Sequence, residues 1–580
     1  MAARQVIVTH ENDAKTVGIS FRYVDEERKI DRIFNFQRST EEEMRTLLGR
    51  ITCNIEKIIN KKRKKKKDDE PPTATDGVEV KMVKLSDGND VPEDMSCYQS
   101  FVTQANNHTL VVGDIKYGID LNPPVVKTID LPKNIMAGYY LYPVKLEVMF
   151  GVAEESLFQW FKSDGKFEND NEAQKNLSSI TWLECGTGRI YHTTVEDIGR
   201  LIKVIVTPCD GDRRGEVAEV TASVLVSAGP GECPFHRRQQ LFTSHLAREN
   251  CLRVVSYNIL ADLYADSDAA RTNLFPTCPA YAIAIDYRKQ LLVAEITGYK
   301  GDLVCLQEVD EKVFLRDLEP ALAETGLDGH YTPKGGSVSE GIALFYRRDK
   351  LRLLEKNRLI LIEELQNNTL FSEAWERVQA CPAAVERINR GTVLQISVLE
   401  CVGEVTGSSA GRILVVGGTH LYFHPNADHV RLLQAGLCIT LLRQVMQLYQ
   451  VKYPEKEVCL VFCGDFNSTP EFAVYRLMTQ QWVGADDIDW SSADGEHIEG
   501  VSFNHDLELD SACGLPPYTN FTPGFHGCLD YIYYQTDKFN VKKVVPLPSH
   551  EEVTEHIALP SITMPSDHLP LIADLQFKSK

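Results

Sequence analysis

The sequence predicts an α/β (α+β) domain over residues 248–580, preceded by an all-β sandwich and a small N-terminal region. Its 580 residues, of which 43% are hydrophobic and 25% charged, have the composition of a globular protein with several cores. Short strands broken by glycine, proline and asparagine fill the middle of the chain, whereas apolar strands alternate with helical stretches near its end. No run of about 18 apolar residues occurs, which excludes a membrane-spanning helix.

Residues 1–134 form the predicted N-terminal region. The stretch EEEMRTLLGRITCNIEKII within it has apolar side chains at helical spacing and indicates a small folded piece. The lysine-rich segment 60–78 follows, and its basic run Lys61 to Lys67 beside three acids and two prolines predicts a solvated, flexible loop. The alternatives are a phosphate-attracting arm or a nuclear-import signal; the absence of interleaved aromatic residues favours the loop.

Residues 135–229 are predicted to form the sandwich. Trp160 in SLFQWFK and Tyr191 ahead of DIG resemble the core tryptophan and the corner tyrosine of an immunoglobulin-like sandwich, although no cysteine pair accompanies them. We interpret both as core residues without chemistry. The GPGECP segment at 229–234 then predicts a linker over residues 230–247.

The charge balance limits how this protein holds a polyanion. Lys plus Arg number 62 against 82 Asp plus Glu, a net charge of −20, so any contact with nucleic acid must be local.

The 15 cysteines lack paired spacings, and several lie in apolar runs, as reduced thiols in a reducing compartment do. The first residues lack the apolar stretch of a signal peptide. They also contain acidic residues, in which transit peptides are poor.

Polar side chains recur at the ends of the apolar strands of the C-terminal domain, where active sites usually form. Each alone has a structural explanation, such as a turn former or a surface acid. Together these carboxylates, amides and histidines, without a cysteine pair, suit a hard divalent cation, and we predict Mg²⁺ with Mn²⁺ as a substitute. The residues are Asn258, Glu308, His420, Asp465, Asn467, Asp530, Asp567 and His568.

These residue types suit the hydrolysis of a phosphodiester. A carboxylate-held cation offsets the charge of the transition state, and histidine and asparagine donors hold the non-bridging oxygens. Asp465 and Asn467 are two residues apart and point the same way on an extended backbone, so one can accept a proton while the other orients the nucleophile. Asp530 could accept a hydrogen bond from His568 and favour its cationic form.

Other chemistries use similar residues. A zinc site could involve His420, His424 and His429, but their spacing fits no HExxH or cysteine-containing pattern. A serine hydrolase would need a GxSxG turn after a strand, which is absent. A phosphate-binding P-loop is absent too, and we interpret Gly335 and Gly336 as part of a flexible loop.

Six segments, in order, resemble the motifs of the exonuclease, endonuclease and phosphatase superfamily: SYNILAD (256–262), CLQEVD (305–310), GTHLYFHP (418–425), FCGDFNSTP (462–470), YTNFTPGFHGCLDYI (518–532) and PSDHLPL (565–571). The resemblance covers about 330 residues and implies two packed, mainly antiparallel β-sheets flanked by helices. Three of the segments resemble its poly(A)-deadenylase branch. PLPSHEEVTEHIALPS (546–561), NPPVV at 122, IMAGYY at 135 and the sandwich are similar to the mitochondrial 2′,5′-phosphodiesterases of that branch.

The resemblance implies a Mg²⁺-dependent 3′-to-5′ exoribonuclease that releases 5′-AMP from 2′,5′-linked oligoadenylate and from 3′,5′-linked poly(A) tails of RNA. It implies a location in the mitochondrial matrix, or otherwise in the cytoplasm, and indicates neither a membrane nor a protein partner. The alternatives are another superfamily phosphoesterase, such as an abasic-site endonuclease or a phosphoinositide phosphatase, and an inactive RNA-binding scaffold.

The same resemblance assigns roles to residues. Glu308 falls at the principal Mg²⁺ ligand, with Asp465, Asn467 and Asp567 completing the metal set. The catalytic set is Asp465, His568, Asn258, Asp530 and His420. Pro425 and Phe525 fall where deadenylases sandwich an adenine, with Asn467 beside them. Stacking of this kind would let an acidic protein hold RNA, because it needs no basic charge.

Overall fold

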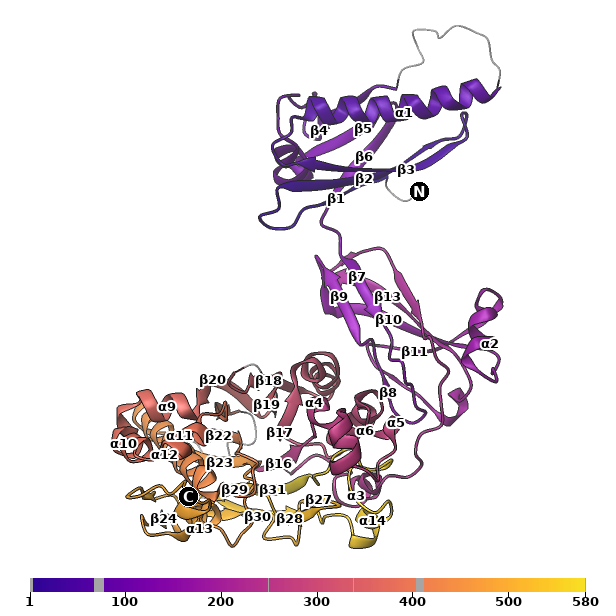
Figure 1. The fold of residues 1–580 in the computed structure, drawn as a ribbon. Helices are drawn as coiled ribbons and strands as arrows, with labels where there is room; N and C mark the ends of the chain where they lie inside the picture. Colours follow the sequence, from indigo (N-terminus) through magenta and orange to yellow (C-terminus); the bar gives the residue numbers. More distant parts are fainter. Residues whose placement is uncertain (1–3, 67–77, 249, 337, 403–410, 579–580) are drawn as a thin grey trace.

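The computed structural model describes residues 4–66, 78–248, 250–336, 338–402 and 411–578, and the chain folds into three successive parts (Figure 1). The first is a six-stranded sheet in the order β3-β2-β1-β6-β5-β4, in which β1 and β6 run parallel. Its strands are β1 (Gln5–Thr9), β2 (Thr16–Asp25), β3 (Ile30–Ser39), β4 (Val80–Lys84), β5 (His108–Val112) and β6 (Ile115–Leu121).

Helix α1 (Met44–Lys66) lies along this sheet and buries Leu47, Ile51 and Ile55 in the shared core (Figure 1). It includes residues 60–66, so the prediction of a flexible loop over 60–78 is wrong at its start. Lysine and arginine are good helix formers, and the run therefore continues a helix already anchored by its apolar face. Residues 67–77 lie outside the described residues.

The second part is the predicted sandwich. One sheet has the order β11-β10-β13-β14, with β15 also paired to β13, and β7 pairs with β9. Trp160 is fully buried and stacks on Tyr191 at 5.9 Å, and the Tyr191 hydroxyl donates to Asp197 Oδ2 at 2.8 Å, as expected for core residues. The bounds are β7 (Val125–Asp130), β9 (Lys145–Met149), β10 (Val152–Ser163), β11 (Trp182–Thr187), β13 (Ile202–Asp210), β14 (Arg213–Arg214) and β15 (Ala218–Thr221).

Because β7 precedes residue 135 but pairs within the sandwich, we propose that the sandwich starts ahead of the predicted boundary.

The predicted linker 230–247 contains helix α3 (Pro234–Phe242), which packs on the C-terminal domain. Arg238 on α3 is buried and donates to the carbonyl oxygens of Pro546 and Pro570 at 2.9 and 3.1 Å. The connection between the two domains is therefore held in place over the length of this helix.

The third part consists of two six-stranded sheets packed face to face, as predicted. The first sheet has the order β18-β19-β17-β16-β31-β30 and the second β20-β21-β22-β23-β29-β26. The pairs β16–β17 and β22–β23 are parallel, and the other pairs within the two sheets are antiparallel. Leucine, valine and cysteine side chains of both sheets fill the space between them.

Helices cover the outer faces of these sheets: α6 (Ile285–Gly298) packs on the first and α12 (Asp428–Lys452) on the second. Among the described residues, no helix combines the length and apolarity needed to cross a membrane. The strands of the first sheet are β16 (Cys251–Asn258), β17 (Leu303–Asp310), β18 (Leu327–Pro333), β19 (Glu340–Arg347), β30 (Phe539–Val544) and β31 (Leu571–Phe577). Those of the second are β20 (Leu351–Ile360), β21 (Val393–Cys401), β22 (Arg412–His420), β23 (Glu457–Asp465), β26 (Leu509–Ser511) and β29 (Asp530–Gln535).

A buried ion cluster supports the first sheet and predicts a stability effect. Asp302 is fully buried and accepts hydrogen bonds from Arg347 Nε at 2.8 Å and Lys350 Nζ at 2.9 Å. Asp302→Ala leaves both cations without this partner and should lower the free energy of unfolding by about 3–5 kcal/mol, measured by urea denaturation of the full chain. The control is Asp328→Ala, whose ion pair with Arg348 is exposed and should contribute less than about 1 kcal/mol. Equal losses would contradict this account.

Candidate active site

The predicted site residues come from strand ends of both sheets. His420 ends β22, Asp465 ends β23 and Asp530 begins β29, and the strand register places the three directly opposite one another. From the facing sheet, Asn258 ends β16 and Glu308 lies near the end of β17. Face-to-face packing of the sheets brings these ends together.

The side-chain amide of Asn258 joins the two sheets. Asn258 is fully buried, and its Nδ2 donates to Glu308 Oε1 at 3.1 Å and to Asp465 Oδ2 at 3.0 Å. A neutral donor between two carboxylates holds them close without neutralising their charge. The sequence-predicted residues Asn258, Glu308 and Asp465 therefore converge.

His568 and Asp530 form a buried pair beside this bridge. His568 Nδ1 lies 2.8 Å from Asp530 Oδ2, and its Nε2 lies 3.6 Å from Asp465 Oδ2. Burial alone would lower the pKa of His568, but the carboxylates of Asp530, Asp465 and Asp567 raise it well above the usual value. These carboxylates therefore favour the cationic form of His568, whose Nε2 faces Asp465. The hydroxyl of Thr519 donates to the same Asp530 oxygen at 2.6 Å and fixes its position.

The carboxylates of the site repel one another. Burial and the nearby charges of Asp567 and Glu340 raise the pKa of Glu308 to about 7. Burial and Asp530 raise the pKa of Asp465 to about 6. A bound divalent cation would relieve both effects, because it stabilises the ionised form of each carboxylate.

Several oxygens are left available for such a cation. Asp530 Oδ1 and Asp567 Oδ1 are buried and have no hydrogen-bond partner among the described residues. Ligand atoms of Asp465, Asp530 and His568 lie within 4.8 Å of one another. Because His568 Nδ1 is paired with Asp530, the carboxylate oxygens fit a hard cation better than this imidazole does.

The backbone is unusual at two of these positions. Glu308 and Asn467 adopt left-handed φ angles of +53° and +48°. The register between β17 and β19 also shifts between Leu306 and Val309, so Glu308 lies on a β-bulge. Such conformations cost on the order of 1–3 kcal/mol and persist where the surrounding structure enforces them. Here the Glu308 carboxylate accepts from Asn258, and the backbone N–H of Asn467 donates to Asp465 Oδ1 at 2.9 Å.

Two charged residues of the site were missed by sequence reasoning. Lys334 Nζ lies 3.3 Å from His420 Nδ1, and Lys334 pairs with the fully buried Glu340. Burial, Lys334 and His568 lower the pKa of His420 well below its usual value, which favours the neutral imidazole. Its Nε2 lies 3.7 Å from Asp465 Oδ2. Lys334 directly follows β18, so the strand-end pattern used for the other residues could have found it.

The remaining predicted residues lie around the site. Asn467 Nδ2 donates to the carbonyl oxygen of Leu421 at 3.0 Å, and Asp567 Oδ2 accepts from Asn520 Nδ2 at 3.1 Å. Pro425 is exposed on the loop between β22 and α12. Phe525 is 47% exposed on the hairpin of β27 (Asn520–Thr522) and β28 (Phe525–Gly527). The adenine sandwich between Pro425 and Phe525 stays a prediction.

The histidines of the zinc alternative point to other partners. His429 Nδ1 lies 2.7 Å from Ser492 Oγ, and His424 Nδ1 lies 3.4 Å from Arg387 Nη1. No metal-binding group of the described residues contains His424 or His429. The arrangement therefore does not favour zinc.

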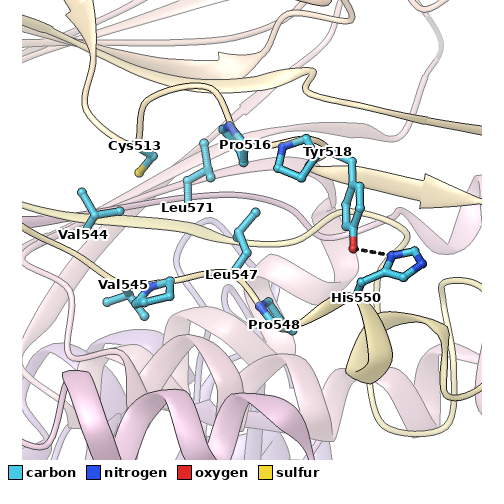
Figure 2. A pocket seen from close by; sticks show the side chains of 11 residues that line it. Cys513, Pro516, Tyr518, Val544, Val545, Leu547, Pro548, His550 and Leu571 are labelled. Carbon is cyan, nitrogen blue, oxygen red and sulfur yellow. Dashed lines mark hydrogen bonds between the residues drawn. The ribbon is translucent and has the colours of Figure 1, made fainter.

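A cavity of about 520 Å³ lies between the loops 513–518 and 544–550, next to Leu571 (Figure 2). Its walls are mainly proline, valine and leucine, and Tyr518 OH and His550 Nδ1 are 3.1 Å apart at one end. Tyr518 precedes Thr519, the residue that holds Asp530, but none of the predicted site residues lines this cavity. The site and this cavity are separate.

Comparison with known proteins agrees with this geometry. The profile of the Endonuclease/Exonuclease/phosphatase family matches residues 255–568, from β16 to His568. The chain belongs to this family. The N-terminal domain of 2′,5′-phosphodiesterase 12-like proteins matches residues 123–227, which is the sandwich.

The relatives within the family are phosphodiesterases and nucleases. The 2′,5′-phosphodiesterase 12 of Rattus norvegicus is 42% identical over 478 residues, which cover 81% of this chain and 76% of that protein. The CCR4-Not complex 3′-5′-exoribonuclease subunit Ccr4 of Candida albicans is 30% identical over 341 residues, which cover 56% of this chain and 41% of that protein. This endonuclease/exonuclease/phosphatase family member is therefore a hydrolase with phosphodiesterase and nuclease activity, in a family that depends on divalent metals.

Among solved structures, this chain is similar to the crystal structure of ANGEL2, a 2′,3′-cyclic phosphatase, in complex with adenosine-2′,3′-vanadate. The two sequences are 20% identical and the TM-score is 0.46. The match covers 58% of this chain and 98% of the ANGEL2 chain.

The Asp530–His568 pair predicts a change in the pH dependence of this family member. In Asp530→Asn a neutral amide replaces the carboxylate that raises the pKa of His568, so His568 loses its proton at a lower pH. We expect kcat for phosphodiester hydrolysis to fall by about 10²–10⁴-fold and the alkaline limb of the pH–rate profile to move to lower pH. Asp510→Asn changes an exposed acid on β26 and should leave the profile as it is. An unshifted alkaline limb in Asp530→Asn would refute the cationic role of His568.

Proposed function

We propose that this protein is a Mg²⁺-dependent 3′-to-5′ exoribonuclease that releases 5′-AMP from 2′,5′-linked oligoadenylate and from 3′,5′-linked poly(A) tails of RNA. The observation that supports it most directly is the convergence of Asn258, His420 and His568 on one oxygen, Asp465 Oδ2, at 3.0–3.7 Å. The names of the relatives, a 2′,5′-phosphodiesterase and a 3′-5′-exoribonuclease, support the choice of substrates.

The proposed metal ligands are Glu308, Asp465, Asn467 and Asp567. The charge of the nearby Asp567 raises the pKa of Glu308, which favours a cation at these carboxylates. When bound, Mg²⁺ supplies positive charge that polarises the scissile phosphate. Mn²⁺ has similar ligand preferences and is the expected substitute.

The chain's own groups account for the proton transfers. Asp465 accepts a proton from the attacking water, whose oxygen forms a bond to phosphorus in line with the bond to the ribose 2′- or 3′-oxygen. That second bond breaks and leaves 5′-AMP and a shortened oligomer. His568, whose cationic form Asp530 favours, donates to a non-bridging oxygen as negative charge develops there. The Asn258 amide holds Glu308 and Asp465 in place, because both of its N–H groups donate to these acids. His420 contacts the phosphate from the other side of Asp465.

Recognition of adenine falls to Pro425, Phe525 and Asn467 in this proposal. Pro425 and Phe525 are exposed on the loop after β22 and on the β27–β28 hairpin, and β27 is bridged to the site through Asn520 and His568. Stacking on such groups contributes about 1–3 kcal/mol per base without basic charge. By resemblance to the mitochondrial 2′,5′-phosphodiesterases, we further propose the mitochondrial matrix as the place where the protein meets these RNAs.

The metal assignment can be tested by removing its principal ligand. Glu308→Ala should lower kcat on both linkages by a factor on the order of 10³ and abolish Mg²⁺ binding measured by isothermal titration calorimetry. EDTA should have the same effect on the wild type. The control is Glu311→Ala, an exposed acid of the same segment, which should retain both properties.

The outcomes separate the alternatives. Undiminished turnover in correctly folded Glu308→Ala, or cleavage in EDTA, would refute the metal assignment. Inert 2′,5′-linked oligoadenylate and oligo(A), with cleavage of an abasic duplex or a phosphoinositide, would refute the proposed substrates. Tight oligo(A) binding without cleavage of any of these would favour the RNA-binding scaffold.

A further inference from the structure

The loop that follows His420 holds an aromatic ring out in solvent. Phe423 is 69% exposed, and its ring lies 5.3 Å from that of Tyr422 in an edge-on contact. Three fully extended residues span at most about 11 Å, so Phe423 lies close to the site that His420 enters. An exposed aromatic side chain next to a nuclease site is a suitable stacking surface for a base.

The backbone under this ring is fixed by two arginines. Arg431 donates to the carbonyl oxygens of Tyr422 and Pro425 at 3.1 and 3.0 Å, and Arg387 donates to that of Asn426 at 2.7 Å. Leu421 N also donates to the carbonyl oxygen of Asp465 at 2.9 Å. Phe423 is therefore exposed on a loop that is firmly held. The loop would lose little conformational entropy when a base packs on the Phe423 ring.

Positive charge lies over the neighbouring Tyr422 ring and next to Lys334. The guanidinium of Arg390 lies over the Tyr422 ring, 5.8 Å from its centroid, and the guanidinium of Arg358 donates to the carbonyl oxygens of Pro333 and Lys334 at 2.8 and 3.0 Å. Both arginines are exposed, and neither pairs with a carboxylate among the described residues. In a chain of net charge −20, two such uncompensated cations favour an anionic partner.

These groups form one continuous surface that begins at the site. Lys334 lies next to His420 and is followed by Gly335. The N–H of Gly335 donates to the carbonyl oxygen of Gly391 at 2.8 Å, and Gly391 directly follows Arg390. A Cβ on Gly391 would lie 2.2 Å from the Gly335 carbonyl oxygen, so this close contact of the two loops requires glycine.

We propose that Arg358, Arg390, Tyr422 and Phe423, here called the aromatic–arginine strip, bind the single-stranded oligonucleotide upstream of the nucleotide that is removed. Phe423 stacks on the next base, while Arg390 and Arg358 contact the phosphates that follow it. The proposal rests on the proposed function, because it extends the same substrate beyond the cleaved linkage. It assigns to this surface a preference for longer chains.

The stacking contact can be tested by substrate length. The ratio of kcat/KM for hexa-adenylate to that for the p-nitrophenyl ester of 5′-AMP should fall about ten-fold in Phe423→Ala, because only hexa-adenylate has an upstream base that reaches the ring. Phe423→Tyr keeps an aromatic face and should keep the ratio. The control is Leu448→Ala, which removes another exposed apolar side chain about 30 Å further along α12 and should leave the ratio unchanged. An unchanged ratio in folded Phe423→Ala would overturn the stacking role.

The phosphate contact can be tested by binding alone. Fluorescence anisotropy with labelled single-stranded hexa-adenylate in EDTA measures Kd at several salt concentrations. Arg390→Ala should reduce the slope of log Kd against log salt by about 0.7, the value for one phosphate contact on a single strand. Arg390→Lys should preserve the slope, and loss of affinity without a change in slope would overturn the contact.

The two proposals fail in distinguishable ways. If the wild type cleaved neither linkage, the proposed function would be refuted, whereas the binding measurement would still decide whether the strip holds single-stranded RNA. If both linkages were cleaved but Phe423→Ala and Arg390→Ala matched the wild type in length preference and salt slope, the strip would be refuted and the proposed function would stand.

Discussion

The site depends on one buried amide that is shared between two carboxylates. Asn258 ends a strand of one sheet and donates to Glu308 of that sheet and Asp465 of the facing sheet. Both acids have raised pKa values, so nothing in their own electrostatics would bring them together. The packed hydrophobic layer between the sheets supplies the free energy that holds the amide and the acids in register. A shift of one sheet against the other would separate these groups.

Charge is distributed unevenly around that bridge. The buried acids favour a divalent cation, Asp530 and the other nearby carboxylates raise the pKa of His568, and burial and Lys334 lower the pKa of His420. The exposed Arg390 lies over Tyr422 in the loop that follows His420, and the exposed Arg358 donates to the carbonyl oxygen of Lys334, on a protein whose net charge is −20. This arrangement lets an acidic protein attract a polyanion at one place while avoiding a general affinity for nucleic acid.

The sequence predicted the types of residue in the site better than their contacts. Polar residues at the ends of apolar strands identified Asn258, Glu308, Asp465 and His568, because strand ends are visible in the hydrophobic pattern. The pairing of Asp530 with His568 was also expected. The direct opposition of His420, Asp465 and Asp530 was not, because the neighbours β23 and β29 are separated by a long stretch of chain and register does not follow from composition.

Other features needed coordinates for different physical reasons. Lys334 follows a strand and could have been found from the sequence, but its ion pair with the buried Glu340 could not, because a pair of opposite charges has no periodic signature. The left-handed φ of Glu308 comes from a bulge against β19 that local propensity does not reveal. At the N-terminal end, the basic composition of residues 60–66 suggested a loop, whereas the apolar face earlier in α1 carries the helix through them.

The central claim is that Glu308 and Asp465, held by Asn258, share a site for a hard cation. The most direct measurement is anomalous diffraction from crystals soaked with Mn²⁺ and 5′-AMP. The account predicts an anomalous peak about 2.0–2.3 Å from a Glu308 carboxylate oxygen, with the phosphate between that peak and His568. Carboxylates of Glu308 and Asp465 that lie apart, with Asn258 bonded to neither and no peak beside Glu308, would contradict it.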